Sequence, residues 1–357
     1  MLTAMLGEYL DFSTGSGAPV RVSDGRFPVY GANGVIGFTA RPNARGPLIV
    51  LGRVGSYCGS AHYCESDVWV TDNALVCRAK EPAETRYWYY ALQTCRLNEY
   101  RAGSGQPLLN QGILRDVSVR TVPEGQRRRI AELLGAFDDK IAANHRVIAA
   151  AEHLMVALVE TVGDRVPLSC LAEHSTALRQ PGHFDDMVAH FSLAAFDDDA
   201  MPRLVRRSTV RSGKFLLSGP CVLFAKLNPR IPRIWNVTRL PTEMAVASTE
   251  FVVLTPAGAD TGPDTSALWA ALRQRDVVES LQQKVAGTSG SHQRVRRADL
   301  MAVAVRDVRR LTASTARTIA GLGALCHARR SESVRLSALR DAALPLLISG
   351  DVRLRAD

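Results

Sequence analysis

The chain has 357 residues, of which 46% are hydrophobic and 22% are charged, and its formal net charge is +9 at pH 7. This length can fill two or three ordinary domains, each with a core of its own. No uninterrupted apolar run is long enough to span a bilayer, and the first residues lack the layout of a signal peptide. These features argue against a membrane or secreted protein, and we expect a cytoplasmic one.

The seven cysteines include no Cys-x-x-Cys motif, which argues against a disulfide framework and against a zinc ribbon. Cys58, His62 and Cys64 have the chemistry of metal ligands but lack a fourth partner at zinc-like spacing. We therefore expect these three residues to pack in the core or in loops, and we predict no metal site.

The first half of the chain begins with β-rich runs at 48–51 and 69–76, followed by a helical stretch at 87–100. A Gly-Ser element (103–110) and an extended stretch (117–122) come next. A long helix then follows, because apolar residues alternate spacings of four and three over more than four heptads. The seam residues are Ile130, Leu134, Phe137, Ile141, Asn144, Ile148, Ala151, Met155, Leu158 and Val162.

The second half repeats this order of elements. Strands are expected at 221–225 and 251–254, a helical stretch at 267–285, a second Gly-Ser element at 287–295 and an extended stretch at 301–305. The chain is thus predicted to be a tandem of two units. The second long helix (311–347) has a weaker seam that breaks at 329–333. We expect the two long helices to pair antiparallel, with Asn144 as a buried polar residue that fixes the register.

Two segments carry basic residues without any acidic one. Residues 25–64 contain Arg26, Arg41, Arg45 and Arg53. Residues 201–240 contain Arg203, Arg206, Arg207, Arg211, Lys214, Lys226, Arg230, Arg233 and Arg239. Cations without interspersed carboxylates predict a positive surface, and nucleic acid is the commonest polyanion of the cytoplasm. A solvated basic face is the alternative interpretation for either segment.

These features resemble the specificity subunits of type I restriction-modification systems. In the first half the resemblance is carried by Gly-Arg-Phe-Pro-Val-Tyr-Gly-Ala-Asn-Gly-Val-Ile-Gly (25–37), by 49–59, by Thr-Asp-Asn-Ala (71–74) and by Gly-Ser-Gly-Gln-Pro (103–107). In the second half it is carried by 222–230, 248–251 and 287–294. The helical segments 126–141 and 339–350 are similar to the two conserved helices of that family. Two departures stand out: the second helix lacks the usual Glu-Gln opening, and the segment before Gly25 is short, so we expect a slightly trimmed first unit.

The resemblance implies an α+β fold: two globular mixed α/β target-recognition domains separated by two long antiparallel coiled-coil helices, in a pseudo-twofold tandem repeat. We expect the first recognition domain at 1–122, the first conserved helix at 123–162, the second recognition domain at 163–306, the second conserved helix at 307–348 and a tail at 349–357. Each domain would read one half of an asymmetric bipartite DNA site, and the helices would fix the spacer and dock methyltransferase subunits.

The residues expected to contact DNA lie in basic or Gly-rich segments, where side chains and backbone can approach phosphates and base edges. In the first half they are Tyr30, Asn33, Arg53, Ser104, Gln106 and Asn110. In the second half they are Lys214, Lys226, Asn228, Arg230, Arg233, Ser289, Ser291, His292, Gln293 and Arg294. Turn formation is the competing role for each of them. Lys226, Arg230 and Arg233 alternate with apolar residues in what we expect to be an extended, exposed ridge.

No catalytic centre is predicted. The chain has no phosphate-binding Gly-x-x-x-x-Gly-Lys-Ser/Thr loop, and Asn-Pro-Arg-Ile (228–231) lacks the second proline and the aromatic residue of the adenine-methyltransferase tetrad. We interpret 228–231 as a turn. Asp138 and Asp139 are expected on a solvated helix face or at a subunit interface, rather than at a metal.

Chemistry is therefore expected from partners and not from this chain, which we predict to hold no cofactor. The resemblance implies two adenine-N6 methyltransferase (M) subunits that use S-adenosylmethionine, and restriction (R) subunits that use ATP and Mg²⁺. An alternative is the recognition portion of a fused (type IIG-like) restriction-methylation enzyme that acts with another chain. A third interpretation is a coiled-coil scaffold whose basic heads bind membranes or RNA, but the chain lacks a basic amphipathic helix with aromatic anchors.

Overall fold

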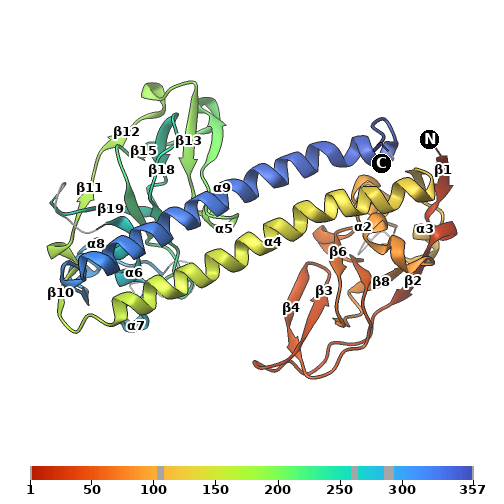
Figure 1. Ribbon diagram of the computed structural model, residues 1–357, viewed down its shortest axis with the longest axis horizontal. Helices are drawn as coiled ribbons and strands as arrows, with labels where there is room; N and C mark the ends of the chain where they lie inside the picture. Colours follow the sequence, from red (N-terminus) through yellow and green to blue (C-terminus); the bar gives the residue numbers. More distant parts are fainter. Residues whose placement is uncertain (1, 103–107, 259–263, 285–292, 356–357) are drawn as a thin grey trace. The chain divides into compact units, whose positions relative to one another are not determined.

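The computed structural model describes residues 2–102, 108–258, 264–284 and 293–355. The chain divides into two compact units: unit 1 comprises residues 1–139 and 336–357, and unit 2 comprises residues 140–335. Each unit contains a β-rich part together with segments of the two long helices, α4 (Glu124–Glu160) and α9 (Ala313–Ser349) (Figure 1).

Unit 1 is built on a four-stranded antiparallel sheet in the order β2 (Leu10–Thr14), β8 (Ala74–Ala79), β5 (Leu48–Gly52) and β6 (Ala61–Cys64). A smaller sheet has the order β4 (Gly34–Thr39), β3 (Phe27–Gly31), β7 (Trp69–Val70), in which β3 and β7 are parallel. A separate pair joins β1 (Leu2–Met5) to β9 (Ser118–Thr121). The helical segments are α1 (Leu6–Tyr9), η1 (Gly55–Tyr57), η2 (Pro82–Glu84), α2 (Thr85–Thr94), η3 (Leu97–Tyr100) and α3 (Gln111–Arg115).

Unit 2 has a four-stranded antiparallel sheet in the order β11 (Ala172–Ser175), β19 (Phe251–Pro256), β16 (Cys221–Ala225), β17 (Ile234–Val237). Its second sheet has the order β12 (Leu178–Arg179), β15 (Lys214–Leu216), β18 (Met244–Ala247), β13 (Met187–Phe191), β14 (Arg203–Arg206). A separate pair joins β10 (Arg165–Pro167) to β20 (Ala304–Arg306). The helical segments are η4 (Leu168–Cys170), η5 (Pro181–His183), α5 (Leu193–Asp197), η6 (Arg207–Thr209), α6 (Thr265–Leu272), α7 (Arg275–Gln283), α8 (Arg297–Met301) and η8 (Val308–Arg310).

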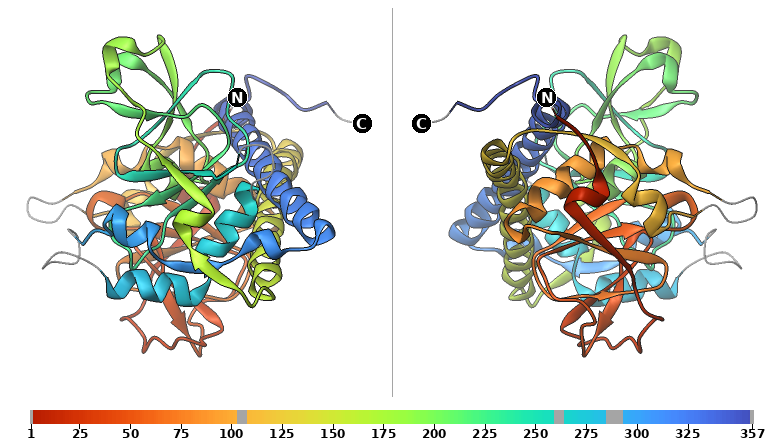
Figure 2. Two further views of the ribbon diagram at one scale, coloured as in Figure 1. Left: turned by 90° about the vertical axis from the view of Figure 1, so that its left-hand side faces the viewer. Right: turned by 90° about the vertical axis from the view of Figure 1, so that its right-hand side faces the viewer.

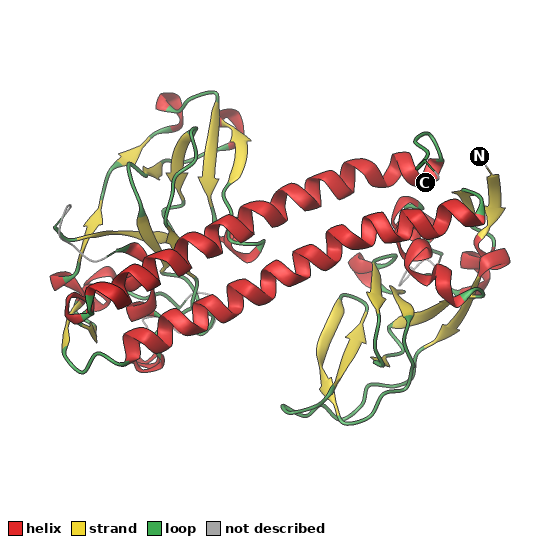
Figure 3. Ribbon diagram, viewed as in Figure 1, coloured by secondary structure: helices red, strands yellow, loops and turns green. Residues whose placement is uncertain are grey.

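The two units share one topology, which confirms the predicted tandem (Figure 3). The sheet order β2-β8-β5-β6 in unit 1 corresponds to β11-β19-β16-β17 in unit 2. The parallel pair β3/β7 corresponds to β13/β18. In both units the strand before the long helix, β9 or β20, pairs with the first strand of the unit. Unit 2 differs by the additional strands β12 and β15.

Three predicted elements have different bounds in the structure. The stretch 87–100 is not one helix, because α2 ends at Thr94 and Arg96 adopts a left-handed conformation with φ of 47°. The stretch 267–285 forms two helices, α6 and α7, since Gln274 has an extended ψ of 138°. Met301 belongs to α8, so that the extended segment begins only at Ala304.

The predicted heptad seam of α4 is confirmed, because all ten of its residues are buried or half-buried. Ile130 and Leu134 pack in the core of unit 1 together with Leu344 and Leu347 of α9. Further along α4, seam residues from Ile148 onward pack in the core of unit 2. The helix itself ends at Glu160, so that Val162 follows it and is buried outside the helix.

The second long helix is continuous, and the break in its apolar pattern at 329–333 is not a break in structure. Ser333 is fully buried and its Oγ accepts a hydrogen bond of 3.2 Å from Nδ2 of Asn144. Asn144 lies 3.5 Å from the Arg329 carbonyl oxygen as well. Helix α9 begins 189 residues after α4. Asn144 and Ser333 are also 189 residues apart, so they occupy equivalent positions in the two helices. The apolar pattern of α9 is therefore interrupted where Ser333 makes a buried polar contact.

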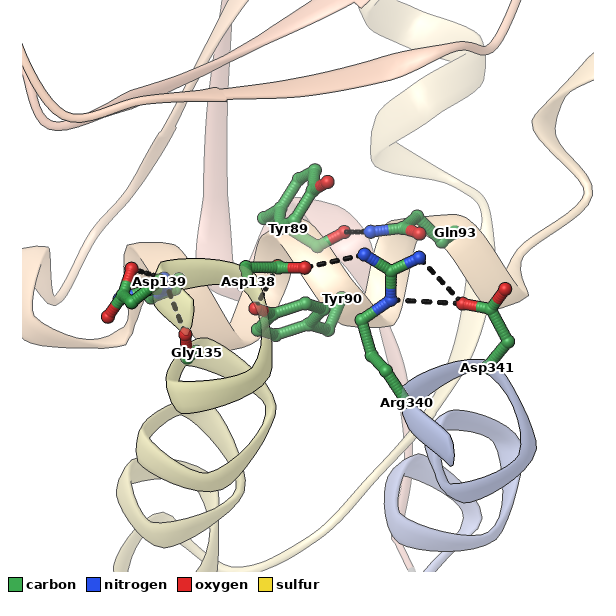
Figure 4. Close-up of polar contacts among 9 residues, drawn as sticks. Tyr89, Tyr90, Gln93, Gly135, Asp138, Asp139, Arg340 and Asp341 are labelled. Carbon is green, nitrogen blue, oxygen red and sulfur yellow. Dashed lines mark hydrogen bonds and ion pairs between the residues drawn. The ribbon is translucent and has the colours of Figure 1, made fainter. Parts of the chain in front are cut away.

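Polar contacts in each unit show the predicted antiparallel pairing of α4 and α9, which lie side by side in the views of Figure 2. In unit 1, Asp138 accepts hydrogen bonds of 2.5 Å from the Tyr90 hydroxyl and from Arg340 (Figure 4). In unit 2, Arg330 of α9 pairs with Glu152 of α4. Within the described residues, none of the helices is both long and apolar enough to cross a membrane.

Asp139 is 67% exposed, as expected for a solvated helix face, whereas Asp138 is only 24% exposed. Asp138 bonds to Tyr90 and Arg340, and Asp139 forms a bidentate pair with Arg86, whose guanidinium also donates to the Gly135 carbonyl at 3.0 Å. A Cβ at Gly135 would lie 2.7 Å from Cζ of Arg86, so a larger residue there would displace the guanidinium. These carboxylates join α4 to α2 and α9.

A buried ion pair lies where α4 begins. Arg127 and Glu84 have side chains only 7% and 8% exposed, and their closest atoms are 2.9 Å apart. Glu84 also accepts a hydrogen bond from the Trp88 indole, while Arg127 donates to the Val122 carbonyl and stacks 4.4 Å from the Tyr9 ring centroid. The charges are thus fully partnered, which is what makes a buried pair tolerable.

Replacing Glu84 with Gln removes the counter-charge of a buried guanidinium, so we expect the free energy of unfolding to fall by about 3 kcal/mol. Urea unfolding monitored by tryptophan fluorescence measures this loss. Glu279→Gln is the matched control, because its partner Arg275 is 92% exposed, and an exposed ion pair contributes little to stability. Equal effects of the two substitutions would contradict the structural role of Glu84.

The Asn144–Ser333 contact is tested by a double-mutant cycle. Asn144→Ala and Ser333→Ala each leave one buried polar group without its partner, whereas the double variant leaves neither. We expect the double variant to be more stable than the sum of the single losses predicts, by about 1 kcal/mol. Strict additivity in urea unfolding would show that the two side chains do not interact.

Candidate nucleic-acid interface

In unit 1 the central strand β5 ends next to Arg53. The Arg53 amide donates to the Asn73 carbonyl at 3.1 Å, and the Arg53 carbonyl accepts from the Leu109 amide at 3.0 Å. Val54 forms an isolated bridge with Leu108. Arg53 is thus held between the residue that precedes β8 and the chain that follows the first Gly-Ser element.

In unit 2 the same position is occupied by Lys226, which follows the central strand β16. The Lys226 amide donates to the Glu250 carbonyl at 2.9 Å, and the Lys226 carbonyl accepts from the Val295 amide at 2.9 Å. Leu227 bridges to Arg294 as Val54 bridges to Leu108. Arg53 and Lys226 are therefore equivalent residues, and each places a cation beside the end of a Gly-Ser element.

The tip of the β3–β4 hairpin lies against the end of β5. The Ser60 hydroxyl donates to the Ala32 carbonyl at 2.9 Å, and a Cβ at Gly52 would lie 2.3 Å from that same oxygen. This contact brings the exposed Asn33 close to the strand end that precedes Arg53. The structure thus gathers three of the predicted residues of unit 1, Tyr30, Asn33 and Arg53, around one strand end.

Tyr30 is half-buried, with its ring centroid 5.9 Å from that of His62. Burial raises the pKa of Tyr30 and lowers the pKa of His62. Both rings are consequently uncharged near pH 7, so they can contribute hydrogen bonds or stacking but no charge. His62 was not predicted as a site residue, and its buried Nε2 has no partner among the described residues.

The remaining described residue of unit 1, Asn110, has a structural role. Its Oδ1 accepts a 2.9 Å hydrogen bond from the Ile113 amide and caps the N-terminus of α3. Ser104 and Gln106 of the first Gly-Ser element lie outside the described residues, and so do Ser289, Ser291 and His292 of the second.

The segment between β16 and β17 is a turn and not the predicted extended ridge. Asn228 adopts a positive φ of 50°, and its carbonyl accepts from the Ile231 amide at 3.0 Å, as expected for a turn at 228–231. The Asn228 amide donates to the Gln293 carbonyl at 3.0 Å, which ties the turn to the second Gly-Ser element. Arg230 is exposed in this turn and forms no ion pair with a described residue.

Arg233 and Lys214 are less available than their sequence suggested. Arg233 forms a bidentate pair with Asp197 at 2.6 and 2.9 Å, and this partner raises its pKa. Lys214 is buried, with its Nζ donating to the carbonyl and hydroxyl of Ser212, and burial lowers its pKa. Neither residue stands on an exposed ridge.

The acid-free segment of unit 2 is partly neutralised by carboxylates from outside it. Ion pairs join Arg203 to Asp198, Arg207 to Asp186 and Arg233 to Asp197, and Arg294 pairs with Glu250 at 3.1 Å. Four arginines of the segment stay exposed without an ion pair to a described residue: Arg206, Arg211, Arg230 and Arg239.

The three residues with metal-ligand chemistry pack within unit 1. Cys58 is buried with its Sγ 3.1 Å from the Arg53 carbonyl, and burial raises the pKa of Cys64 to about 11. Within the described part of the chain, no group of three or more His, Cys, Asp or Glu residues could hold a metal ion.

The equivalence of Arg53 and Lys226 was missed at the level of sequence, although a signal exists. Both follow a run of five buried residues that ends at the cation, Leu48–Gly52 in one unit and Cys221–Ala225 in the other. Glu250 was also missed, because its role as the counter-ion of Arg294 depends on the approach of two residues 44 positions apart in the sequence.

Comparison with known proteins finds sequence matches to one family. Residues 21–153 match the family described as the type I restriction modification DNA specificity domain. A segment of 113 residues is 28% identical to the type I restriction enzyme EcoprrI specificity subunit of Escherichia coli, covering 31% of this chain and 28% of that protein. The match therefore spans less than a third of that relative.

Two solved structures align over nearly the whole chain. The S subunit of a type I restriction-modification system from M. genitalium superposes with a TM-score of 0.58 at 13% identity, covering 97% of this chain and 96% of that one. The HsdS subunit from Thermoanaerobacter tengcongensis covers 98% of this chain and 97% of its own, at 14% identity and a TM-score of 0.33. The first of these shows that the fold is shared over nearly the whole length.

Alanine substitution should affect DNA affinity and its salt dependence differently at Arg53 and Lys226 than at Arg233. Arg53→Ala or Lys226→Ala should weaken binding to any duplex DNA and reduce the slope of log K against log salt by about 0.9 for each phosphate that the variant no longer neutralises. Arg233→Ala removes an ion pair with Asp197 instead, so it should leave the salt slope unchanged. Fluorescence anisotropy over a series of salt concentrations measures all three; a reduced slope for Arg233→Ala alone would contradict the assignment.

Proposed function

We propose that this chain, a member of the family of type I restriction-modification specificity subunits, recognises DNA for such a complex. Each unit reads one half of a bipartite site, and the paired helices fix the spacer between the halves. The repeated topology carries this proposal: two units with the same sheet order present Arg53 and Lys226 from equivalent strand ends.

The DNA site of such a protein is asymmetric, because the two units present different side chains at equivalent places. Unit 1 offers the uncharged Tyr30 and the amide of Asn33, which can bond to adenine. Unit 2 offers Arg230 in its turn, and arginine reads guanine through two hydrogen bonds in the major groove. Different donors and acceptors select different bases, so we propose two unlike half-sites.

We further propose that the chain recognises the DNA sequence and that partner subunits catalyse the reactions. Two adenine-N6 methyltransferase subunits with S-adenosylmethionine methylate the site, and restriction subunits with ATP and Mg²⁺ cleave DNA. The long helices offer apolar surface to such partners: Leu133, Val147 and Leu154 of α4 and Leu339 of α9 are exposed. The complex acts in the cytoplasm.

The test is to co-express the chain with the methyltransferase encoded beside it and to map methylated adenines by sequencing. We expect a split, asymmetric motif with a fixed spacer, and a purified complex of one chain with two methyltransferases. A continuous motif, or purification without any methyltransferase, would refute the proposal. A single fused enzyme partner would favour the alternative of a divided restriction-methylation protein.

The same experiment tests the assignment of one half-site to each unit. Arg230→Ala should relax base preference in one half of the motif, and Asn33→Ala should relax it in the other half. If either substitution affected both halves equally, the units would not read DNA independently.

A further inference from the structure

Unit 1 exposes apolar side chains on an edge strand. β4 is the outer strand of its sheet, and Val35, Ile36 and Phe38 on it are 49%, 40% and 45% exposed. An exposed apolar edge is a liability for aggregation, and proteins retain such a surface mainly where it binds a partner. We therefore expect the exposed face of β4 to bind a partner.

A bulge directs these side chains outward. In the β3–β4 pairing Tyr30 lies opposite Val35 and Val29 opposite Gly37, which leaves Ile36 as an additional residue without a partner. A Cβ at Gly31 would lie 3.2 Å from Cγ2 of Ile36, so the glycine makes room for that side chain. Bulges re-aim side chains next to functional sites, and this one presents Val35 and Ile36 in succession.

The charges around the hairpin identify the kind of occupant. Arg21, Arg26 and Arg41 are exposed beside it and form no ion pair with a described residue. Arg21 donates to the Ile36 carbonyl at 3.1 Å, which keeps its guanidinium at the strand. The hairpin also continues into the tip with Asn33, next to the end of β5 that precedes Arg53. Apolar side chains flanked by arginines complement the base edges and phosphates of DNA.

In unit 2 the topologically equivalent pair is β13 and β14, which are joined through α5 and not by a tight turn. β14 is the edge strand beside β13, just as β4 is the edge strand beside β3. Leu204 is 53% exposed and Met187 is 38% exposed. Met187 lies directly across from Arg206, which is exposed and forms no ion pair with a described residue. This pair thus repeats the combination of apolar side chains and cations with different residues.

We propose that the ribbon β3–β4 of unit 1 enters the major groove of DNA and that the edge strand β14 of unit 2 faces this groove, so that Val35, Ile36 and Phe38 in unit 1 and Leu204 and Met187 in unit 2 contact thymine methyl groups. The major groove is about 12 Å wide and admits a two-stranded β-ribbon. The flanking arginines bind phosphates on either side. This inference rests on the proposed function and names the elements that carry its specificity.

The apolar readout is tested with Val35→Ser/Phe38→Ser in the complex with the methyltransferase. Both side chains are exposed, so the melting temperature should stay unchanged. Affinity for the duplex that contains the mapped motif should fall about tenfold, the loss typical of one base contact, while affinity for a scrambled duplex is retained. Arg26→Ala/Arg41→Ala should weaken both duplexes alike, because phosphate contacts carry no sequence information.

Leu2→Ser is the matched control, since Leu2 is 48% exposed in unit 1 but lies on β1, outside the ribbon. It should change neither affinity. Leu204→Ser should affect only the half of the motif that Val35→Ser/Phe38→Ser leaves intact. If the ribbon variant loses the methyltransferase but binds DNA normally, the ribbon is a protein interface and the inference is wrong. Unchanged affinity for both duplexes would overturn it as well.

Replacing the thymines of the first half-site with uracil removes only their methyl groups. The wild-type complex should lose affinity for this duplex, and Val35→Ser/Phe38→Ser should not lose more. A half-site without A·T pairs, or one whose uracil form binds equally well, would contradict the methyl contact. Failure of the proposed function itself looks different, because the wild-type complex would then bind no sequence preferentially.

Discussion

The pairing of α4 with α9 is the interaction on which both units depend. Each unit takes a segment from each helix into its own core: Leu134 and Leu347 belong to the core of unit 1, and Met155 and Ile319 belong to the core of unit 2. Neither core is complete without residues distant in sequence. The buried contact of Asn144 with Ser333 fixes the register of the pair, because shifting one helix would leave both polar groups without a partner.

Some arginines are paired with carboxylates and stabilise the fold, whereas others are left available to a ligand. Arg127, Arg86 and Arg340 hold α4 to its neighbours through carboxylates. In unit 2, carboxylates from outside the basic segment pair with several of its arginines. Fewer of the nine basic residues at 201–240 are therefore available to a ligand than the sequence suggests.

The two units combine a common frame with different surfaces. The hydrogen bonds that hold Arg53 recur around Lys226, and the edge ribbon of one unit recurs in the other. Backbone geometry is thus repeated, whereas exposed side chains such as Phe38 and Leu204 differ. The two units therefore differ in the side chains that they expose and not in the backbone frame that carries them.

The sequence by itself determined the tandem order, the long helices and the buried seam of α4, because apolar periodicity and the order of elements are local properties of the chain. The sequence also predicted the basic segments, but it did not predict which of their side chains are free to bind a ligand. Asp197 pairs with Arg233 only in the folded chain, and Lys214 is buried. Likewise, only the structure shows that Ser333, where the apolar pattern breaks, forms a buried hydrogen bond with Asn144. Tertiary structure alone decided the equivalence of Arg53 with Lys226 and the exposure of the ribbons, since both depend on strand pairing between residues far apart in sequence.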